Sequence, residues 1–212
     1  MLKRLRILLL LLPVLAMLPE LPMDSDVDAA EKQRSGPLEA AGQGLENLRL
    51  LVTEKNLKAM GFESPSEATL AKLGDPMQVF RVPLDELRNY QPNSDPERLL
   101  VDADRIIYPV VVRDIRSLVI VEKTAKGWQP TNLGSPKLAK VLFDRRKEKS
   151  DFIVWVPALN LYFVANRVDN KLMLTPVLDD PNVELSAGRT LPADKVFSLI
   201  VPAAKSYNGL PN

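Results

Sequence analysis

Aspartates are the residues of this chain whose type could most readily support catalysis. A pair of carboxylates roughly 5–10 Å apart hydrolyses glycosidic bonds by acid–base chemistry. Each candidate, however, falls at a predicted strand end or in a loop, where solvated turn acids are ordinary. A carboxylate-based hydrolase is therefore only an alternative, and we assign no catalytic residue. The candidates are Asp151, Asp169, Asp179 and Asp180.

Other catalytic chemistry is restricted by composition, because the chain has no histidine and no cysteine. This excludes Ser-His-Asp triads, Cys-His pairs and the usual zinc sites. Its nine glycines form neither G-x-G-x-x-G nor G-x-x-x-x-G-K, the loops that bind phosphate groups. We therefore predict that the protein is not an enzyme and needs no cofactor.

Three acidic residues near the N-terminus, Asp24, Asp26 and Asp28, resemble the start of a calcium-binding EF-hand loop. Such a loop requires glycine at its sixth position and glutamate at its twelfth. This chain has Ala29 and Ser35 there, so we predict no metal site.

Lysines form the first candidate binding surface. Lys137, Lys140 and Lys147 recur at helical spacing and could contact anionic lipid, cell-wall polymer or an acidic partner. The simpler interpretation is a charged outer face that keeps an amphipathic helix solvated.

A charged link between two strand-like runs is the second candidate. Residues 105–112 and 117–122 are rich in β-branched side chains and predict a hairpin. Its tip carries Arg113, Ile115 and Arg116, which we consider a candidate partner contact. Because Pro109 cannot donate to a strand ladder, we expect a bulge there.

A ligand groove marked by aromatic residues is a further alternative. Those on predicted strands favour core packing instead, since aromatic side chains suit half-buried strands. Trp155 shares the parity of Ile153 and should face the same side of the sheet. The residues concerned are Trp128, Trp155, Tyr162 and Phe163.

Helices are predicted from apolar periodicity, caps and stop signals. Ser64 and Glu67 form a capping box with proline at the first helical position. Gly61 is a natural stop for the first helix, and Pro202 should end or kink the last one. The predicted helices are 37–60, a short one from Ser64, another short one from Ser94 through Val101, one from Ser135 to about Lys147, and 192–200.

Strands complete an α+β pattern of the order α-α-β-α-βββ-α-βββ-α. The residues Asp169 and Asn170 suit a two-residue turn with positive φ. Hairpin-length links imply an antiparallel sheet with an N-terminal helix and with helices packed on one face. Residues 105–148 and 151–208 each read as three strands and a helix, which raises internal duplication as an alternative. The strands are 77–82, 105–112, 117–122, one from Trp128, 152–156, 161–168 and 171–176.

This order of elements is similar to that of cystatin-like, NTF2-like and PepSY-like small domains over residues 37–208. The resemblance implies the fold alone. The cystatin signature Q-x-V-x-G has as its counterpart Val110-Val-Val-Arg-Asp114, which lacks both Gln and Gly, so no inhibitory function is implied.

The N-terminus predicts export. Lys3, Arg4 and Arg6 precede an apolar run over residues 7–18; this length suits a signal peptide and is below the roughly 20 residues that span a bilayer. We predict a signal peptide over residues 1–29, cleaved after Ala29 or Ala30. A tether (30–36) and a single domain (37–212), with a sub-division near 149–151, would follow. The alternative is an uncleaved membrane anchor.

Composition completes the functional prediction. The chain has 212 residues, 46% of them hydrophobic and 26% charged, with a net charge of +1, which fits a globular protein and does not suggest nucleic-acid binding. We predict a bacterial periplasmic or secreted protein that binds a protein, a peptide or an envelope component without catalysis. An inhibitor or chaperone-like module that acts on an exported protease or hydrolase by strand addition is the alternative.

Overall fold

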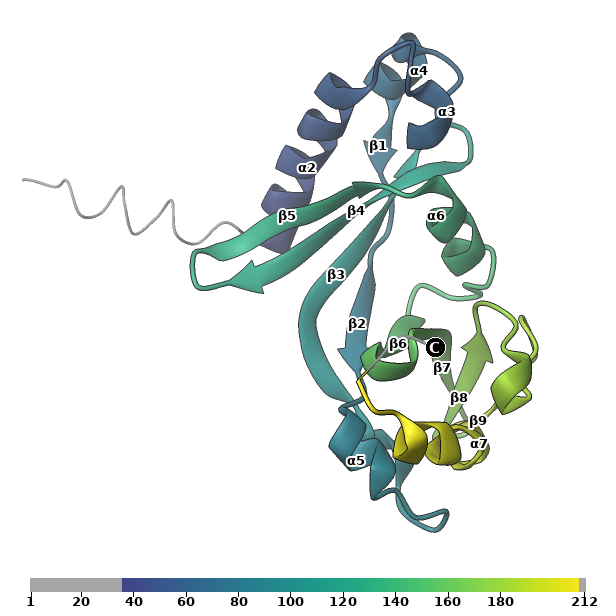
Figure 1. The fold of residues 1–212 in the computed structure, drawn as a ribbon. Helices are drawn as coiled ribbons and strands as arrows, with labels where there is room; N and C mark the ends of the chain where they lie inside the picture. The colour runs from purple at the N-terminus through teal and green to yellow at the C-terminus, as the bar shows by residue number, and fades with distance from the viewer. Residues whose placement is uncertain (1–35, 210–212) are drawn as a thin grey trace, which may run out of the picture.

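The computed structural model describes residues 36–209, so the expected signal peptide and nearly all of the tether lie outside the described residues. Within that range, nine strands form one sheet in the order β5-β4-β3-β2-β6-β7-β8-β9, with β1 paired to β3 (Figure 1). All described pairings are antiparallel except β2 with β6, which is parallel. The α+β class is confirmed.

The strands follow the alternating runs of the sequence closely. Asp169 and Asn170 turn the β7–β8 hairpin with φ of 50° and 59°, as predicted. The strands are β1 (Lys72–Leu73), β2 (Met77–Arg81), β3 (Val101–Val111), β4 (Ile115–Thr124), β5 (Gly127–Gly134), β6 (Phe152–Val156), β7 (Leu161–Val168), β8 (Lys171–Pro176) and β9 (Leu191–Pro192).

The helices are shorter and more numerous than predicted. Six α-helices and three 3-10 turns occur among the described residues. They are α2 (Pro37–Leu51), α3 (Leu57–Met60), α4 (Pro65–Leu70), α5 (Leu84–Arg88), α6 (Pro136–Phe143), α7 (Ala193–Ser206), η1 (Pro96–Leu99), η2 (Pro157–Leu159) and η3 (Pro181–Val183).

The single helix predicted over 37–60 is wrong, because Asn56 interrupts it. The Asn56 side chain donates to the Leu51 carbonyl oxygen and accepts from the Thr53 backbone N–H. These bonds satisfy backbone groups at the end of α2 and favour a turn over continued helix. Gly61 then ends α3 with φ 92°, as its position predicted.

The ends of two other helices also differ from those predicted from the sequence. The helix predicted to reach Lys147 ends at Phe143, because the Asp151 carboxylate accepts the backbone N–H groups of Lys147 and Glu148 and builds a turn there. Helix α7 passes through Pro202 to Ser206, where we expected an end or a kink. Pro202 lies on the exposed side of α7, so water can solvate the carbonyl that loses its bond.

The predicted hairpin is β3–β4, and its body lies in the core. Val110, Leu118 and Val119 are fully buried. On the edge of β3 away from β4, the pairing with β2 ends at Ile107 and the pairing with β1 begins at Val110. Pro109 lies between these two pairings. A ladder donor is not needed at that point. The bulge against β4 comes just afterwards, between Val110 and Val111.

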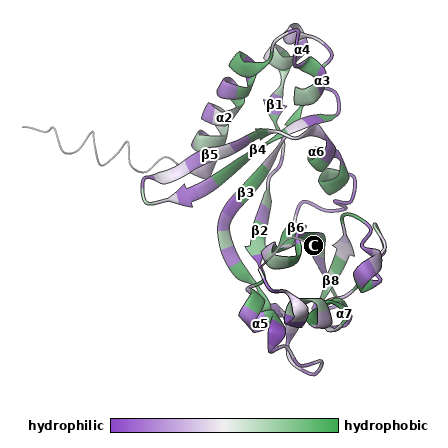
Figure 2. Ribbon diagram, viewed as in Figure 1, coloured by the Kyte–Doolittle hydropathy of each residue, from purple (hydrophilic) through white to green (hydrophobic). Residues whose placement is uncertain are grey.

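Alternating residues separate the two faces of the sheet. Along β6, Ile153 packs with α6, whereas Val154 packs with α5 and α7. Along β3, Ile107 packs with α6 and Tyr108 with α2. Helices α2, α5 and α7 therefore cover one face and α6 covers the other, so the expectation of helices on one face is wrong for α6. Figure 2 shows apolar and polar residues mixed along α2 and α6, as suits helices with one buried side.

The helix positions do not match a duplication. The units β3–β5 and β6–β8 run outward from β2 in mirrored order, and β3 is antiparallel to β6 across β2. A two-fold axis relating them would stand perpendicular to the sheet and would keep their following helices on one face. Instead, α6 and α7 lie on opposite faces.

Candidate functional site

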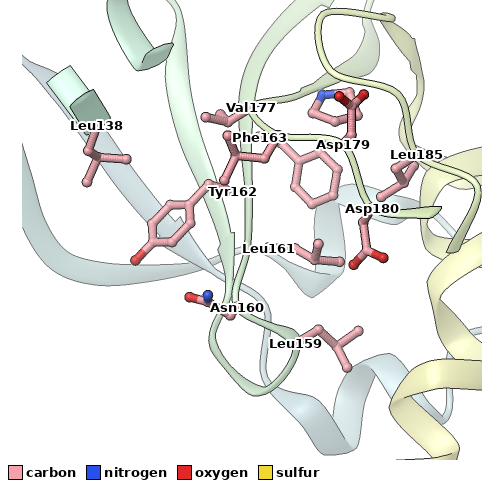
Figure 3. A pocket seen from close by; sticks show the side chains of 12 residues that line it. Leu138, Leu159, Asn160, Leu161, Tyr162, Phe163, Val177, Asp179, Asp180 and Leu185 are labelled. Atoms are coloured by element: carbon pink, nitrogen blue, oxygen red, sulfur yellow. The ribbon is translucent and has the colours of Figure 1, made fainter. Parts of the chain in front are cut away.

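A cavity of about 230 Å³ with both apolar and polar lining lies where β7 begins and β8 ends (Figure 3). Its walls come from α6, from the η2 turn, from β7, and from the loop that follows β8. Most of the lining side chains are apolar, and Asn160, Tyr162 and two aspartates supply the polar groups. The lining residues are Leu138, Leu159, Asn160, Leu161, Tyr162, Phe163, Pro176, Val177, Leu178, Asp179, Asp180 and Leu185.

Local backbone bonds place the apolar walls. Asn160 ends the η2 turn in the left-handed region, with φ 52°, a conformation that asparagine tolerates better than most residues. The chain reverses there, and Leu159 and Leu161 both line the cavity. Across from them, the Val177 N–H donates to the Tyr162 carbonyl oxygen at 2.9 Å, which extends the β7–β8 ladder by one residue and holds the far wall.

The two aspartates at the cavity also hold its loop. Asp179 accepts the Ala187 backbone N–H at 2.8 Å, and Asp180 accepts the Asn182 backbone N–H at 3.0 Å. In each case the accepting atom is Oδ1, so one carboxylate oxygen of each side chain is engaged in loop structure. Both residues remain lining groups of the cavity (Figure 3).

The four candidate aspartates do not form one catalytic group. Asp169 lies in the turn before β8 and Asp179 lies just after its end, so a six-residue strand, on the order of 20 Å long, separates them. Asp151 is buried and builds the turn before β6. Asp151 therefore has a structural role, whereas Asp179 and Asp180 lie at the cavity.

Leu178 is the most unusual apolar residue of the site. It lines the cavity and yet is 66% exposed. Exposed leucines are common on protein surfaces, but one beside an apolar cavity extends a single apolar surface from the interior outward. Leu178 and Leu159 thus offer contact area to whatever enters.

The Trp155 ring and the Arg105 cation support the Tyr162 side chain. The ring of Tyr162 stacks on Trp155, with centroids 5.8 Å apart and planes 15° apart. The Arg105 guanidinium carbon lies 4.5 Å from the centre of the Trp155 ring, and Arg105 pairs with Glu122 at 2.5 Å. Burial raises the pKa of the Tyr162 phenol above its ordinary value, whereas the charge and hydrogen bond of Arg105 oppose that rise. The stack fixes the orientation of Tyr162.

The aromatic residues pack mainly in the core, as predicted. Phe163 is fully buried in the core beneath α5 and α7, and it also lines the cavity. Tyr162, at the preceding position of β7, packs on the opposite face of the sheet and lines the cavity as well. Trp155 is half-buried, on the side of the sheet where Ile153 packs, as its parity predicted. Trp128 packs against the buried residues between α2 and the sheet.

The hairpin tip lies elsewhere and is tied to α4. Arg116 forms ion pairs with Glu67 at 3.0 Å, with Glu63 at 3.4 Å and with Asp114 at 2.9 Å. Ile115 is half-buried on the face of the sheet that α6 covers, and Arg113 is exposed. Arg116 and Ile115 thus have structural roles; contact of this tip with a partner stays a prediction.

The three candidate lysines are exposed but do not share one helix. Lys137 and Lys140 lie on α6, and Lys147 follows it in the loop. The helical stripe inferred from spacing is therefore interrupted after Lys140. An anionic contact for these lysines stays a prediction.

No group of three or more acidic residues is placed to hold a metal ion within residues 36–209. In the same range, no helix has both the length and the apolar content needed to cross a membrane. Comparison with known protein families, curated proteins and solved structures finds no match. The similarity to cystatin-like, NTF2-like and PepSY-like domains stays a prediction from element order.

Proposed function

We propose that this protein is an exported, non-enzymatic binding domain of the bacterial envelope that holds polypeptide segments by an apolar side chain. The observation that carries the proposal is the exposed Leu178 beside a cavity to which eight apolar residues contribute. Export is supported by the basic residues Lys3, Arg4 and Arg6 before the apolar run at residues 7–18.

The dimensions of the cavity support a side chain as its occupant. Pockets for whole small molecules have volumes of roughly 300–1,000 Å³, and this cavity has about 230 Å³. An engineered cavity of about 150 Å³ is large enough for benzene. One leucine- or phenylalanine-sized side chain of a larger partner fits this range.

The chemistry of the lining supports binding over catalysis. Among the lining residues, titratable groups are Tyr162, Asp179 and Asp180. Each aspartate accepts a loop N–H, and burial raises the pKa of Tyr162, which keeps its phenol protonated in neutral solution. A neutral phenol and two loop-forming carboxylates orient a ligand more readily than they transfer protons.

Peptide binding tests the proposal directly. Dye-labelled peptides of glycine and serine with one central leucine should bind the purified chain, as measured by fluorescence anisotropy, and the same peptides with serine at the centre should not. If leucine and serine peptides gave the same signal at every concentration, the proposed function would be wrong.

A matched pair of leucine variants locates the binding. Leu178→Ser should weaken affinity by about 1–2 kcal/mol, the value of burying part of a leucine side chain. Leu50→Ser removes an equally large exposed side chain from α2, where Leu50 is 82% exposed, and should leave affinity unchanged. Equal losses from both variants would place the contact elsewhere.

A further inference from the structure

The charged residues at the cavity indicate which kind of polypeptide segment binds there. We propose that the preferred segment places a lysine or arginine next to the apolar side chain that enters the cavity, so that the cation pairs with Asp179 and Asp180. This inference rests on the proposed function and adds specificity to it.

The first step is the position of the carboxylates. Asp179 and Asp180 are lining residues, and they follow directly after Leu178 in the chain. Leu178 and two carboxylates are therefore neighbours in one loop, and Figure 3 shows the Asp179 and Asp180 side chains of that loop. A partner that covers Leu178 brings its neighbouring residues close to these carboxylates.

The second step is the capacity of the carboxylates to accept more bonds. Each ionised carboxylate has about four lone-pair sites, and the loop uses Oδ1 of each for one N–H group. An ammonium or guanidinium group can therefore pair with them without displacing the bonds that form the loop.

The third step is the balance of charge around the loop. Arg145 brings one positive charge to this region, since its Nε donates to the Pro176 carbonyl oxygen at 3.3 Å. The same loop also carries Glu184 and Arg189. Its acidic residues therefore exceed Arg145 and Arg189 by one negative charge. A cationic partner residue is thus favoured and an acidic one is repelled.

Three peptide series separate the outcomes. Three peptides have a glycine–serine frame with one central leucine, followed by Lys-Lys, Gln-Gln or Glu-Glu. A fourth, control peptide has serine in place of the leucine before Lys-Lys. We expect Leu-Lys-Lys to bind about fivefold or more tightly than Leu-Gln-Gln at low salt, with Leu-Glu-Glu weakest, since exposed charge pairs contribute modestly. The difference should shrink as salt screens the charges.

Charge-removal variants assign the effect to this loop. Asparagine retains an oxygen acceptor for the loop N–H groups, so the double variant Asp179→Asn, Asp180→Asn should fold and should lose the preference for Leu-Lys-Lys over Leu-Gln-Gln. Asp169→Asn removes one negative charge from the exposed turn at the other end of β8 and should preserve the preference.

The outcomes distinguish this inference from the proposed function. Equal binding of Leu-Lys-Lys and Leu-Gln-Gln to the unchanged protein would overturn the inference and leave the proposed function standing. A preference that survives in the double variant would also overturn it. Binding of Ser-Lys-Lys as tight as Leu-Lys-Lys would mean charge attraction alone and would overturn both, as would no binding by any peptide.

Discussion

At the scale of single residues, Arg116 shows how a candidate contact residue can serve the fold. Its guanidinium joins the start of β4 to the start of α4 through Glu63 and Glu67. The Arg116 and Glu67 side chains are 22% and 14% exposed, so this ion pair is less screened by solvent than surface pairs are, whereas Glu63 is exposed. A partner that used this arginine would have to compete with the pairs already formed.

The first prediction concerns this arginine. Arg116→Met should lower the free energy of unfolding by about 1–2 kcal/mol in urea titrations, more than a typical exposed pair provides. The control Arg113→Met changes an exposed neighbour and should stay within about 0.5 kcal/mol. Equal effects from both variants would show that the ion pairs of Arg116 do not stabilise the fold.

The second prediction concerns alkaline pH. Burial raises the pKa of the Tyr108 phenol above its ordinary value. The unfolded chain then loses this proton at a lower pH than the folded chain does, so stability is fully present below pH of about 10 and falls as pH rises above it.

The variant Tyr108→Phe tests the assignment. It should lose less stability between neutral and strongly alkaline pH than the unchanged protein does, as measured by urea midpoints at each pH. Other alkaline groups contribute equally to both proteins and cancel in this comparison. An identical alkaline loss in both would rule out Tyr108 as a contributor.

At the scale of elements, two glycines of α2 have opposite roles that their spacing alone does not reveal. A Cβ built on Gly44 would lie 2.6 Å from Val119 Cγ1 and 3.1 Å from Pro130 Cβ, whereas one on Gly42 would meet nothing within 4 Å. Gly44 is therefore the point where α2 approaches β4 and β5 most closely.

The third prediction follows from that contrast. Gly44→Ala should destabilise the protein by about 1–3 kcal/mol through overpacking. Gly42→Ala should stabilise it by up to about 1 kcal/mol, because alanine favours the helix. Thermal or urea unfolding measures both, and a stabilised Gly44→Ala variant would mean that α2 does not pack against β4 this closely.

Local patterns predicted the strands well and the helix ends poorly. The strands β6, β7 and β8 match their alternating runs because burial on each face sets a period of two. The end of α2 depends on the side-chain bonds of Asn56, and the passage of α7 through Pro202 depends on its exposed position. Such ends are decided by contacts that periodicity does not encode.

The cavity could not be predicted from the sequence for a related reason. Leu138, Leu161 and Leu178 come together only because β2 pairs in parallel with β6 and places α6 beside the β7–β8 hairpin. No short-range pattern specifies this pairing. The local signal available was an apolar residue before two acids, Leu178-Asp-Asp180, in a loop.

At the scale of the whole molecule, export is the part of the proposal that depends on the N-terminus. The fourth prediction is that protein recovered from the envelope or medium of expressing cells begins at Ala30 or Glu31, as found by N-terminal sequencing. Protein that kept Met1 and stayed with the membrane fraction would support the alternative of an uncleaved anchor.

The central claim is that the cavity beside Leu178 receives an apolar side chain. Intermolecular NOEs between the leucine methyl groups of a bound Leu-Lys-Lys peptide and methyl-labelled protein test it most directly. We predict NOEs to Val177, Leu159 and Leu178. NOEs to Ile115 at the hairpin tip, or to none of the cavity methyl groups in a saturated complex, would contradict the claim.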